Sequence, residues 1–408
     1  MNKLELFRFF RDTFVPPSLR PRFNFWCRYV LYNRWYRFYF LGSFNLLKYV
    51  SRPLGKRKKR ILAFENFYNN SPALGSFLEF QMRALCLAEL HDIDTIDIAL
   101  IYDLKTPLWN PKMSKWLSPS NFQLLLYEIL PLLNLNSKLG SVFVFNCRDD
   151  FESFLTQHSG EYILCPSLFH YINKSGAASG NYGFVRNFYL KKRYLPQFVF
   201  KPNIALWAKA FIKKYAGDKY PVAVNLRMNP FFGENRNSDI PSWRHLFEYC
   251  LNKHPEIVFL LLAQQQEAPD DLKHMSNIIF VKNHKTTMEQ DMCLIKHSLF
   301  FMGVASGPTS FTNLTNDIPY RVFRVQMFDR SYTYNWHKPG SQWPWAEKTL
   351  QKLVWEKESP DSLIKEFEHL FRLVDKESWR KKMEVDQSKI KILEWPYIYE
   401  DNQTQSKN

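Results

Sequence analysis

From residue 60 onwards, the chain alternates between short apolar runs and stretches in which apolar residues recur every three or four positions. The first pattern is typical of strands and the second of amphipathic helices. In the first half of this region, strands are predicted at 61–64, 95–102, 141–146 and 162–164, and helices over 74–85 and 121–132. Because strand, helix and strand follow in that order, we expect a right-handed βαβ arrangement with a parallel sheet.

The same alternation is stronger in the second half of the chain. Residues 257–262 form an unbroken apolar run, which is typical of a central parallel strand covered on both faces. A helix with one buried face is expected from Pro241, where Asp239 is a suitable cap. Another is expected from Thr286, with Glu289 completing a capping box. The strands predicted here lie at 222–226, 257–262, 278–281, 299–302 and 321–325, with further helices at 204–215, 270–275 and from Thr309.

Both halves predict the α/β class, as two Rossmann-like doubly wound domains that face a cleft. The 408 residues suit two domains of ordinary size. Segment 173–183 is rich in small residues and glycine, so we predict a surface loop there. The expected division is a basic aromatic arm at 1–59, a first α/β domain at 60–202, a second α/β domain at 203–335, a loop and helices that pack back at 336–400, and a disordered tail at 401–408.

The charge of the chain is informative mainly in the N-terminal segment. The chain has a formal net charge of +16, which favours an anionic partner. The excess is concentrated in the first part of the chain, where arginine and lysine are interleaved with aromatic residues. Such a mixture suits a lipid headgroup region, so residues 20–60 are predicted to contact an acidic membrane surface. The alternative is that the aromatic rings pack on the body of the protein, and we do not expect nucleic acid as the partner.

The cysteines and the apolar runs indicate the compartment. Six cysteines are scattered without paired spacing, so neither a disulfide framework nor a zinc site is indicated, and a reducing compartment fits. The sequence has no cleavable leader pattern and no run of about 20 apolar residues. We therefore expect a cytoplasmic protein, held peripherally at the inner face of the membrane.

Polar residues gather where the predicted strands of the second domain end, the edge at which doubly wound sheets bind ligands. Arg227 and Asn229 follow the first strand, Arg236 lies in the same loop, and Gln264 follows the second strand. A buried arginine is costly without an anion, so Arg227 indicates a phosphate, with an ion pair to a nearby acid as the alternative.

A turn of small residues, 303–310, follows the fourth strand and leads into a helix. Free amides and the partial positive charge at a helix start suit a phosphate, although small residues also serve simple packing. The candidate contacts are Ser306, Gly307, Pro308, Thr309 and Ser310.

Together, the strand exit and this turn resemble the C-terminal donor-binding domain of GT-B glycosyltransferases, in particular the heptosyltransferase-like and fucosyltransferase-like branches. In those branches the strand exit reads His-x-Arg and the turn reads Gly-x-(Asp/Ser)-(Ser/Thr)-Gly-Pro. Here Asn225 takes the place of the histidine, and Ala305 takes the place of the acidic residue.

The resemblance implies roles for these residues. Arg227 would neutralise the diphosphate of a nucleotide-sugar donor, Ser306 and Gly307 would cradle it, and Gln264 would lie near the nucleoside. The protein would move the sugar to a glycan or lipid-linked acceptor in surface polysaccharide synthesis, and residues 203–335 would bind the donor.

The first domain would then supply the acceptor side and the general base, for which Glu65, at the end of the first strand, is the candidate. No DxD pair suggests a metal-held diphosphate, so we predict a metal-independent transferase with no cofactor besides the donor substrate. Two alternatives stay open. One is an isomerase of the nucleotide-sugar 2-epimerase type, and the other is a non-catalytic nucleotide-binding or scaffold protein.

Overall fold

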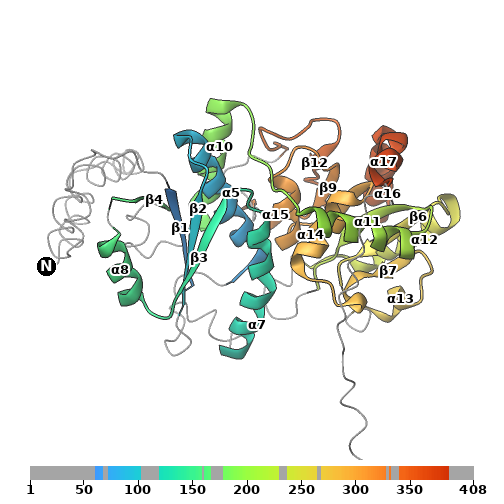
Figure 1. The fold of residues 1–408 in the computed structure, drawn as a ribbon. Coiled ribbons are helices and arrows are strands. Elements are labelled where there is room, and N and C mark those ends of the chain that lie inside the picture. Colours follow the sequence, from blue (N-terminus) through green and yellow to red (C-terminus); the bar gives the residue numbers. More distant parts are fainter. Residues whose placement is uncertain are drawn as a thin grey trace, which may run out of the picture. The chain divides into compact units, whose positions relative to one another are not determined.

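The structure is a computed structural model that describes residues 60–67, 72–102, 119–158, 160–166, 178–228, 237–263, 268–327, 330–331 and 340–385 (Figure 1). The predicted arm at 1–59 and the tail at 401–408 lie outside these residues. The chain divides into two compact units. The first is Met1–Val199 with Ser306–Thr315 and Trp343–Trp345, and the second is Phe200–Ala305 with Asn316–Gln342 and Ala346–Asn408.

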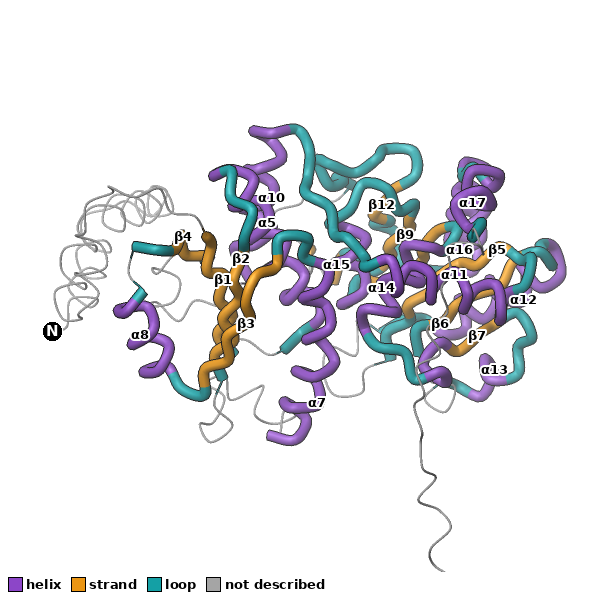
Figure 2. Tube along the Cα trace, viewed as in Figure 1, coloured by secondary structure: helices purple, strands orange, loops and turns teal. Residues whose placement is uncertain are grey.

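The first unit contains a four-stranded parallel sheet in the order β3-β2-β1-β4 (Figure 2). Its strand order therefore reverses between β1 and β4, as in a doubly wound fold. The strands are β1 (Arg60–Asn66), β2 (Ile96–Ile101), β3 (Leu139–Phe145) and β4 (Tyr162–Cys165). The helices are α5 (Leu74–His91), α7 (Pro119–Ile129), the 3₁₀ helix η3 (Leu130–Leu135), α8 (Arg148–Gln157), α10 (Ala178–Lys192) and α15 (Gly307–Asn313).

Each face of the first sheet packs against a different helix. Leu62 and Phe64 of β1 join Phe151 and Leu155 of α8 in one apolar cluster. Side chains alternate along a strand, so Ala63 and Glu65 point to the opposite face, where α5 packs. Helices α10 and α15 in turn pack against α5. The position of Glu65 thus follows from the period of β1.

Helix α10 corrects one prediction. The segment 173–183 was expected to be a loop, but α10 begins at Ala178. The serine, glycine and asparagine residues in its first two turns have weak helix propensity, and the helix is stabilised by burying Tyr182, Val185 and Phe188, with α10 packed against α5. Tertiary packing therefore overrides local propensity here.

The second unit contains a six-stranded parallel sheet in the order β12-β9-β8-β5-β6-β7. The strands are β5 (Tyr220–Asn225), β6 (Ile257–Leu261), β7 (Ile278–Phe280), β8 (Phe300–Val304), β9 (Tyr320–Phe323) and β12 (Gln351–Leu353), beside a short antiparallel pair, β10 (Gln326–Met327) and β11 (Arg330–Ser331). The helices are α11 (Pro202–Ala216), α12 (Ile240–Lys253), α13 (Asp270–Lys273), the 3₁₀ helix η6 (Val281–His284), α14 (Met288–His297), α16 (Pro360–Leu373) and α17 (Lys376–Met383).

Two apolar clusters cover the two faces of this sheet. One combines β5 and β6 side chains with α12 and α16, including Trp243, Phe247 and Phe367. The other combines Val258 and Leu260 of β6 with α11 and α14. Read along the chain, the strand order is that of the Rossmann fold. The predicted α/β class with doubly wound parallel sheets is confirmed, although the second sheet has one more strand, β12, than the sequence predicted.

Helix α14 begins one residue later than predicted. Its capping box is formed by Thr287 and Gln290, since the Gln290 backbone nitrogen donates to Thr287 Oγ1 at 3.2 Å and the Thr287 nitrogen donates to Gln290 Oε1 at 2.9 Å. The predicted cap, Thr286, instead donates its hydroxyl to Asp291 at 2.6 Å. Both adjacent threonines fit the capping pattern in the sequence. In the structure, Thr286 bonds to the buried Asp291, which leaves Thr287 as the cap.

Candidate functional site

Both sheets reverse their strand order beside their first strand, between β1 and β4 in the first unit and between β5 and β8 in the second. Neighbouring loops at such a switch point turn to opposite faces of the sheet, so ligands bind there, outside the carboxyl ends of the strands. The predicted residues Glu65 and Arg227 lie at these two points, on or directly after β1 and β5. Each unit therefore has one of the predicted residues at its switch point.

Arg227 is fixed at the switch point of the second unit by its backbone. Its amide nitrogen donates to Ser238 Oγ at 3.0 Å, and its carbonyl oxygen accepts from the Ser238 nitrogen at 2.9 Å. These two bonds close the loop between the two residues, and the Arg227 side chain is half-buried. Asn229 and Arg236, both in this loop, and Gln264 lie outside the described residues.

The neighbouring strand β8 comes close to β5 because it carries a glycine. Gly303 is paired with Asn225, and a Cβ atom on Gly303 would lie 2.8 Å from the Asn225 carbonyl oxygen. Ala305, which replaces the acidic residue of the glycosyltransferase pattern, is buried and donates its backbone N–H to Phe323 at 2.9 Å. Ser306 is therefore the first residue after β8 that is not buried.

The turn after β8 is tighter than predicted. Helix α15 begins at Gly307, two residues before the expected Thr309, and it has only seven residues. The Thr309 hydroxyl is used locally, since it donates to the Ser306 carbonyl oxygen at 2.6 Å and accepts from the Ser306 nitrogen at 3.0 Å. Thr309 and Ser310 are buried, whereas Ser306, Gly307 and Pro308 are half-buried. Among the predicted phosphate contacts, these last three remain accessible to a ligand.

In the first unit, α15 packs closely on the first turn of α5. A Cβ atom on Gly75 would lie 2.7 Å from the Ser310 hydroxyl, and one on Gly307 would lie 3.0 Å from Leu74 Cβ. A side chain at Gly75 would require Ser310 to shift, and one at Gly307 would require Leu74 to give way. The two glycines therefore set the position of Ser310 against α5.

Glu65 lies near the end of β1 and is 4% exposed. Two positions earlier, Ala63 pairs with Cys165 of β4. Burial raises the pKa of the Cys165 thiol to about 11, with Arg83 opposing and Glu65 adding to the shift. Glu65 and Arg83 therefore both act on the switch point of the first unit.

Glu79 belongs to this site, although the sequence analysis did not select it. It lies one turn after Gly75 on α5, and part of its side chain remains accessible. Burial raises the pKa of Glu79 to about 8, a hydrogen bond with Ser310 opposes this shift, the charge of Glu65 adds to it, and the Tyr182 hydroxyl opposes it more weakly. A signal was available, because a glycine one turn before an acidic residue on an apolar helix indicates close approach of another element.

A second arginine lies at the same edge of the second sheet but has a structural role. Arg324 follows β9 with a left-handed φ of 50°, and its Nε donates to Glu358 at 2.6 Å. The buried Glu358 carboxylate also accepts from Trp243 Nε1 at 3.0 Å and from the backbone nitrogen of Asp239. This network ties the start of α12 to the end of β9.

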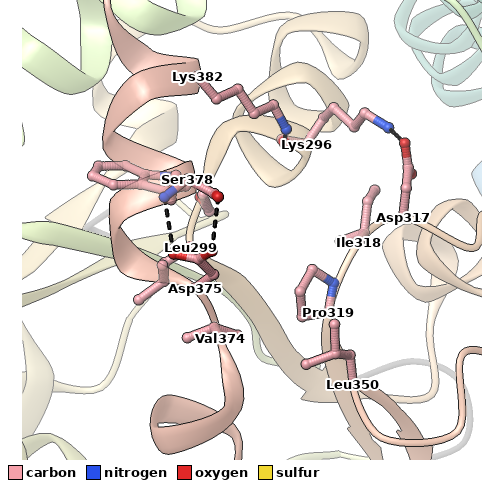
Figure 3. A pocket seen from close by; sticks show the side chains of 12 residues that line it. Lys296, Leu299, Asp317, Ile318, Pro319, Leu350, Val374, Asp375, Ser378 and Lys382 are labelled. Carbon is pink, nitrogen blue, oxygen red and sulfur yellow. Dashed lines mark hydrogen bonds and ion pairs between the residues drawn. The ribbon is translucent and has the colours of Figure 1, made fainter.

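The second unit also has a cavity of about 180 Å³ at the opposite, amino edge of its sheet (Figure 3). Its walls include Leu299, Pro319 and Leu350, which directly precede β8, β9 and β12. Of the charged groups there, Lys296 pairs with Asp317, Lys382 donates to the Lys296 carbonyl oxygen, and Asp375 accepts from Ser378. Ligand pockets usually have at least about 300 Å³, so this cavity is too small for a nucleotide sugar.

Two features are absent from the described part of the chain. No helix in it is both long and apolar enough to cross a membrane. Within the same residues, no group of three or more histidine, cysteine, aspartate and glutamate side chains is arranged to hold a metal ion.

The fold and its switch points define a protein with two doubly wound α/β units of the Rossmann type. No family model and no curated protein matches the chain. Among solved structures, it is similar to E. coli ADP-heptose LPS heptosyltransferase II, with a TM-score of 0.45 and 10% identity over 77% of this chain and 99% of that one. It is also similar to a glycosyl transferase family 9 protein from Veillonella parvula DSM 2008, with a TM-score of 0.45 and 11% identity over 80% of this chain and 93% of that one.

Proposed function

We propose that the protein is a glycosyltransferase that takes its sugar from a nucleotide-sugar donor. The observation that carries this proposal is the position of Arg227, held by its backbone at the switch point where β5 and β8 end side by side. A doubly wound sheet binds nucleotides at this point. Loop 228–237 and the turn after β8 start from the same two strand ends.

The donor's diphosphate is the group that Arg227 suits. A guanidinium group binds phosphate oxygens through two parallel hydrogen bonds, and it does so more strongly where the surroundings are partly desolvated. Ser306, Gly307 and Pro308 follow β8 and bring small residues to the same ligand. We propose Asn229, Arg236 and Gln264 as further donor contacts, the last near the nucleoside. Thr309 and Ser310 are buried, so we propose that they stabilise the turn and do not contact the donor.

In the reaction, the oxygen of the acceptor hydroxyl forms a bond to the anomeric carbon of the sugar. The bond from that carbon to the phosphate oxygen breaks, and the electron pair leaves with the nucleoside diphosphate. Arg227 stabilises the negative charge that develops on this leaving group. Such cationic stabilisation makes the proposed transfer independent of a metal ion and of any cofactor. The acceptor proton goes to a carboxylate of the first unit, with Glu65 as the predicted base.

We also propose that the acceptor is a glycan or a lipid-linked glycan of surface polysaccharide synthesis. Residues 20–60, most of which belong to the basic aromatic arm at 1–59, would hold the enzyme at an acidic membrane surface on the cytoplasmic side, close to a lipid-linked acceptor.

Thermal unfolding with UDP-, GDP-, ADP- and CMP-sugars tests the donor site, because a ligand that binds only the folded protein raises its Tm. We expect one nucleotide class to raise the Tm of the wild-type chain. Arg227→Ala should weaken that binding about 10- to 100-fold, the effect of losing roughly 1.5–3 kcal/mol of charged hydrogen bonding. Arg244→Ala is the matched control, since Arg244 lies on the surface of α12. A wild-type chain that responds to none of these sugars contradicts the proposal.

The neighbouring carboxyl groups Glu65 and Glu79 favour a second candidate, isomerisation of the nucleotide-sugar 2-epimerase type, which needs carboxylates around the sugar ring. Product analysis separates the two functions. A free epimer formed from the donor without any acceptor supports the isomerase, whereas a product that contains the acceptor supports the transferase.

A further inference from the structure

The cavity at the amino edge of the second sheet lies entirely within the second unit. Its walls come from the end of α14, from the residues just before β8, β9 and β12, and from α17 with the two residues before it (Figure 3). Its volume of about 180 Å³ is larger than the roughly 150 Å³ of an apolar protein cavity that binds benzene. A ligand somewhat larger than benzene therefore fits, although a nucleotide sugar does not.

One end of the cavity is apolar. Val374, Pro319 and Leu350 line the end that lies away from the lysine side chains (Figure 3). Trp379 also lines the cavity, and its ring is held in place because Nε1 donates to the His297 carbonyl oxygen at 2.8 Å. Hydrocarbon groups of a ligand would leave water on contact with these walls, which is favourable. The cavity is therefore suited to a ligand with an apolar body.

The other end carries lysine side chains. Lys296 forms an ion pair with Asp317 (Figure 3). Lys382 is exposed, and its ammonium group donates to the Lys296 carbonyl oxygen, in the last turn of α14, at 3.0 Å. Within the described ranges, Lys382 pairs with no carboxylate. An ammonium group can donate more than one hydrogen bond, so the carbonyl oxygen holds it at the rim of the cavity and leaves donors for a ligand.

The negative charges of the lining already have partners. Asp317 is paired with Lys296. Asp375 caps α17, since its side chain accepts from the Ser378 nitrogen at 2.9 Å and from the Ser378 hydroxyl at 2.7 Å. Lys382 is thus the charged group of the lining that an additional ligand can neutralise.

A further cation lies beside the same end of α17. Lys209 of α11 donates to the carbonyl oxygen of Glu384, directly after α17, at 3.2 Å. Lys209 and Lys382 each bond to the C-terminal end of a helix, where cations are favoured by the helix dipole. Such capping explains where the ammonium groups lie, but it offsets only part of their charge. This end of the cavity therefore attracts anions.

We infer that the cavity is a second ligand site, which binds a small anion with an apolar body, such as a short-chain carboxylate or a phosphate monoester. The anionic head group pairs with the Lys382 ammonium group, and the hydrocarbon part contacts Leu350 and Val374. A bare inorganic anion would leave the apolar walls unused, and an amine would meet the Lys382 charge. The site lies at the edge of the sheet opposite the proposed donor site and does not depend on the proposed function.

Thermal unfolding of the full chain with sodium alkanoates tests this site, because a ligand that binds only the folded protein raises its Tm as its concentration increases. The series is acetate, butyrate and hexanoate at one ionic strength, with hexylammonium chloride and hexanol as the matched cationic and neutral probes. Each buried methylene group strengthens binding about fourfold, so hexanoate should bind about 15-fold more tightly than butyrate. Hexylammonium and hexanol should each raise the Tm less than hexanoate does.

Two variants locate the ligand. Lys382→Gln should weaken hexanoate binding about 5- to 10-fold by removing a charged hydrogen bond. Lys381→Gln is its matched control, because Lys381 is exposed on the same helix and does not line the cavity. Leu350→Phe fills the apolar end, so it should remove the gain in affinity with chain length. Its control is Leu251→Phe, on the exposed surface of α12.

Several outcomes would overturn the inference. Equal Tm shifts with acetate and hexanoate would show that the apolar walls are not used, and equal shifts with hexylammonium and hexanoate would show that the head group is not recognised. Equal losses in Lys381→Gln and Lys382→Gln would indicate a general effect of charge. If Lys382→Gln does not fold, Leu350→Phe decides, since unchanged hexanoate binding in that variant places the ligand elsewhere. None of these measurements uses a nucleotide sugar, so their result is independent of the proposed transferase activity.

Discussion

Replacing Glu79 by glutamine should change how the stability of the protein depends on pH. The pKa of Glu79 is raised from the ordinary 4.5 to about 8 in the folded chain, because burial and the charge of Glu65 disfavour the carboxylate. Between these two values, the folded protein holds a proton that the unfolded chain releases. The stability linked to Glu79 is therefore fully present below pH 4.5 and is lost as the pH rises through about 8.

The size of this effect follows from the shift. Each unit of pKa difference corresponds to about 1.36 kcal/mol, so a shift from 4.5 to about 8 has an upper limit near 5 kcal/mol. Part of the Glu79 side chain is accessible to solvent, which screens the charge. We therefore expect roughly 2–4 kcal/mol of stability to be lost across this range. Glutamine has the same shape as glutamate but does not titrate, so the stability of Glu79→Gln should not show this loss as the pH rises.

Urea unfolding at intervals of about one pH unit from pH 5 to pH 9 measures this directly, since the midpoint and slope give the free energy of unfolding at each pH. The informative quantity is the difference between the wild-type chain and Glu79→Gln, in which the titration of all other groups largely cancels. That difference should fall steadily up to about pH 8 and then become constant. The same comparison with Glu89→Gln should show no such fall. A difference between wild type and Glu79→Gln that stays constant over the whole range would refute the raised pKa, without requiring any substrate.

The glycines give two further predictions. Gly75→Ala places a Cβ atom 2.7 Å from the Ser310 hydroxyl, so it should destabilise the protein by about 1–3 kcal/mol, whereas Gly183→Ala on α10 meets nothing within 4 Å and should stabilise by about 0.5–1 kcal/mol. Thermal unfolding of both variants checks this, and equal effects would contradict the close packing of α15 on α5. Gly303→Ala, with its Cβ 2.8 Å from the carbonyl oxygen of Asn225, should lower both the Tm and the donor-induced thermal shift, and an unchanged Tm would contradict the close approach of β8 to β5.

The second sheet was largely predictable from sequence because its central strands are unbroken apolar runs. Residues 257–262 can be stable only when covered on both faces, and β6 has this environment. Strand β12, Gln351–Leu353, could not be found in the same way. It has three residues, and its strand character comes from pairing with β9, through partners such as Leu353 and Val322.

The candidate site was predictable to the extent that it depends on strand ends. Glu65 and Arg227 were selected because parallel strands bring their carboxyl ends to one edge. Glu79 was not selected, because its environment is formed by Ser310 and Tyr182, which lie far away in the sequence. The local pattern of apolar and polar residues does not indicate contacts between residues far apart in the sequence. In addition, α10, which carries Tyr182, was itself predicted to be a loop in part.

Helix α15 has a consequence for how the protein is made. Ser306–Thr315 belongs to the first unit by its contacts, yet it follows four of the six strands of the second unit's sheet in the sequence. While the chain emerges from the ribosome, the first turn of α5 cannot pack against α15 until strands β5 to β8 have been synthesised. Domains usually fold in order from the N-terminus during synthesis. Here the first unit begins folding early and completes its packing late, so a chain that stops before residue 306 would leave the α15-binding surface of α5 uncovered.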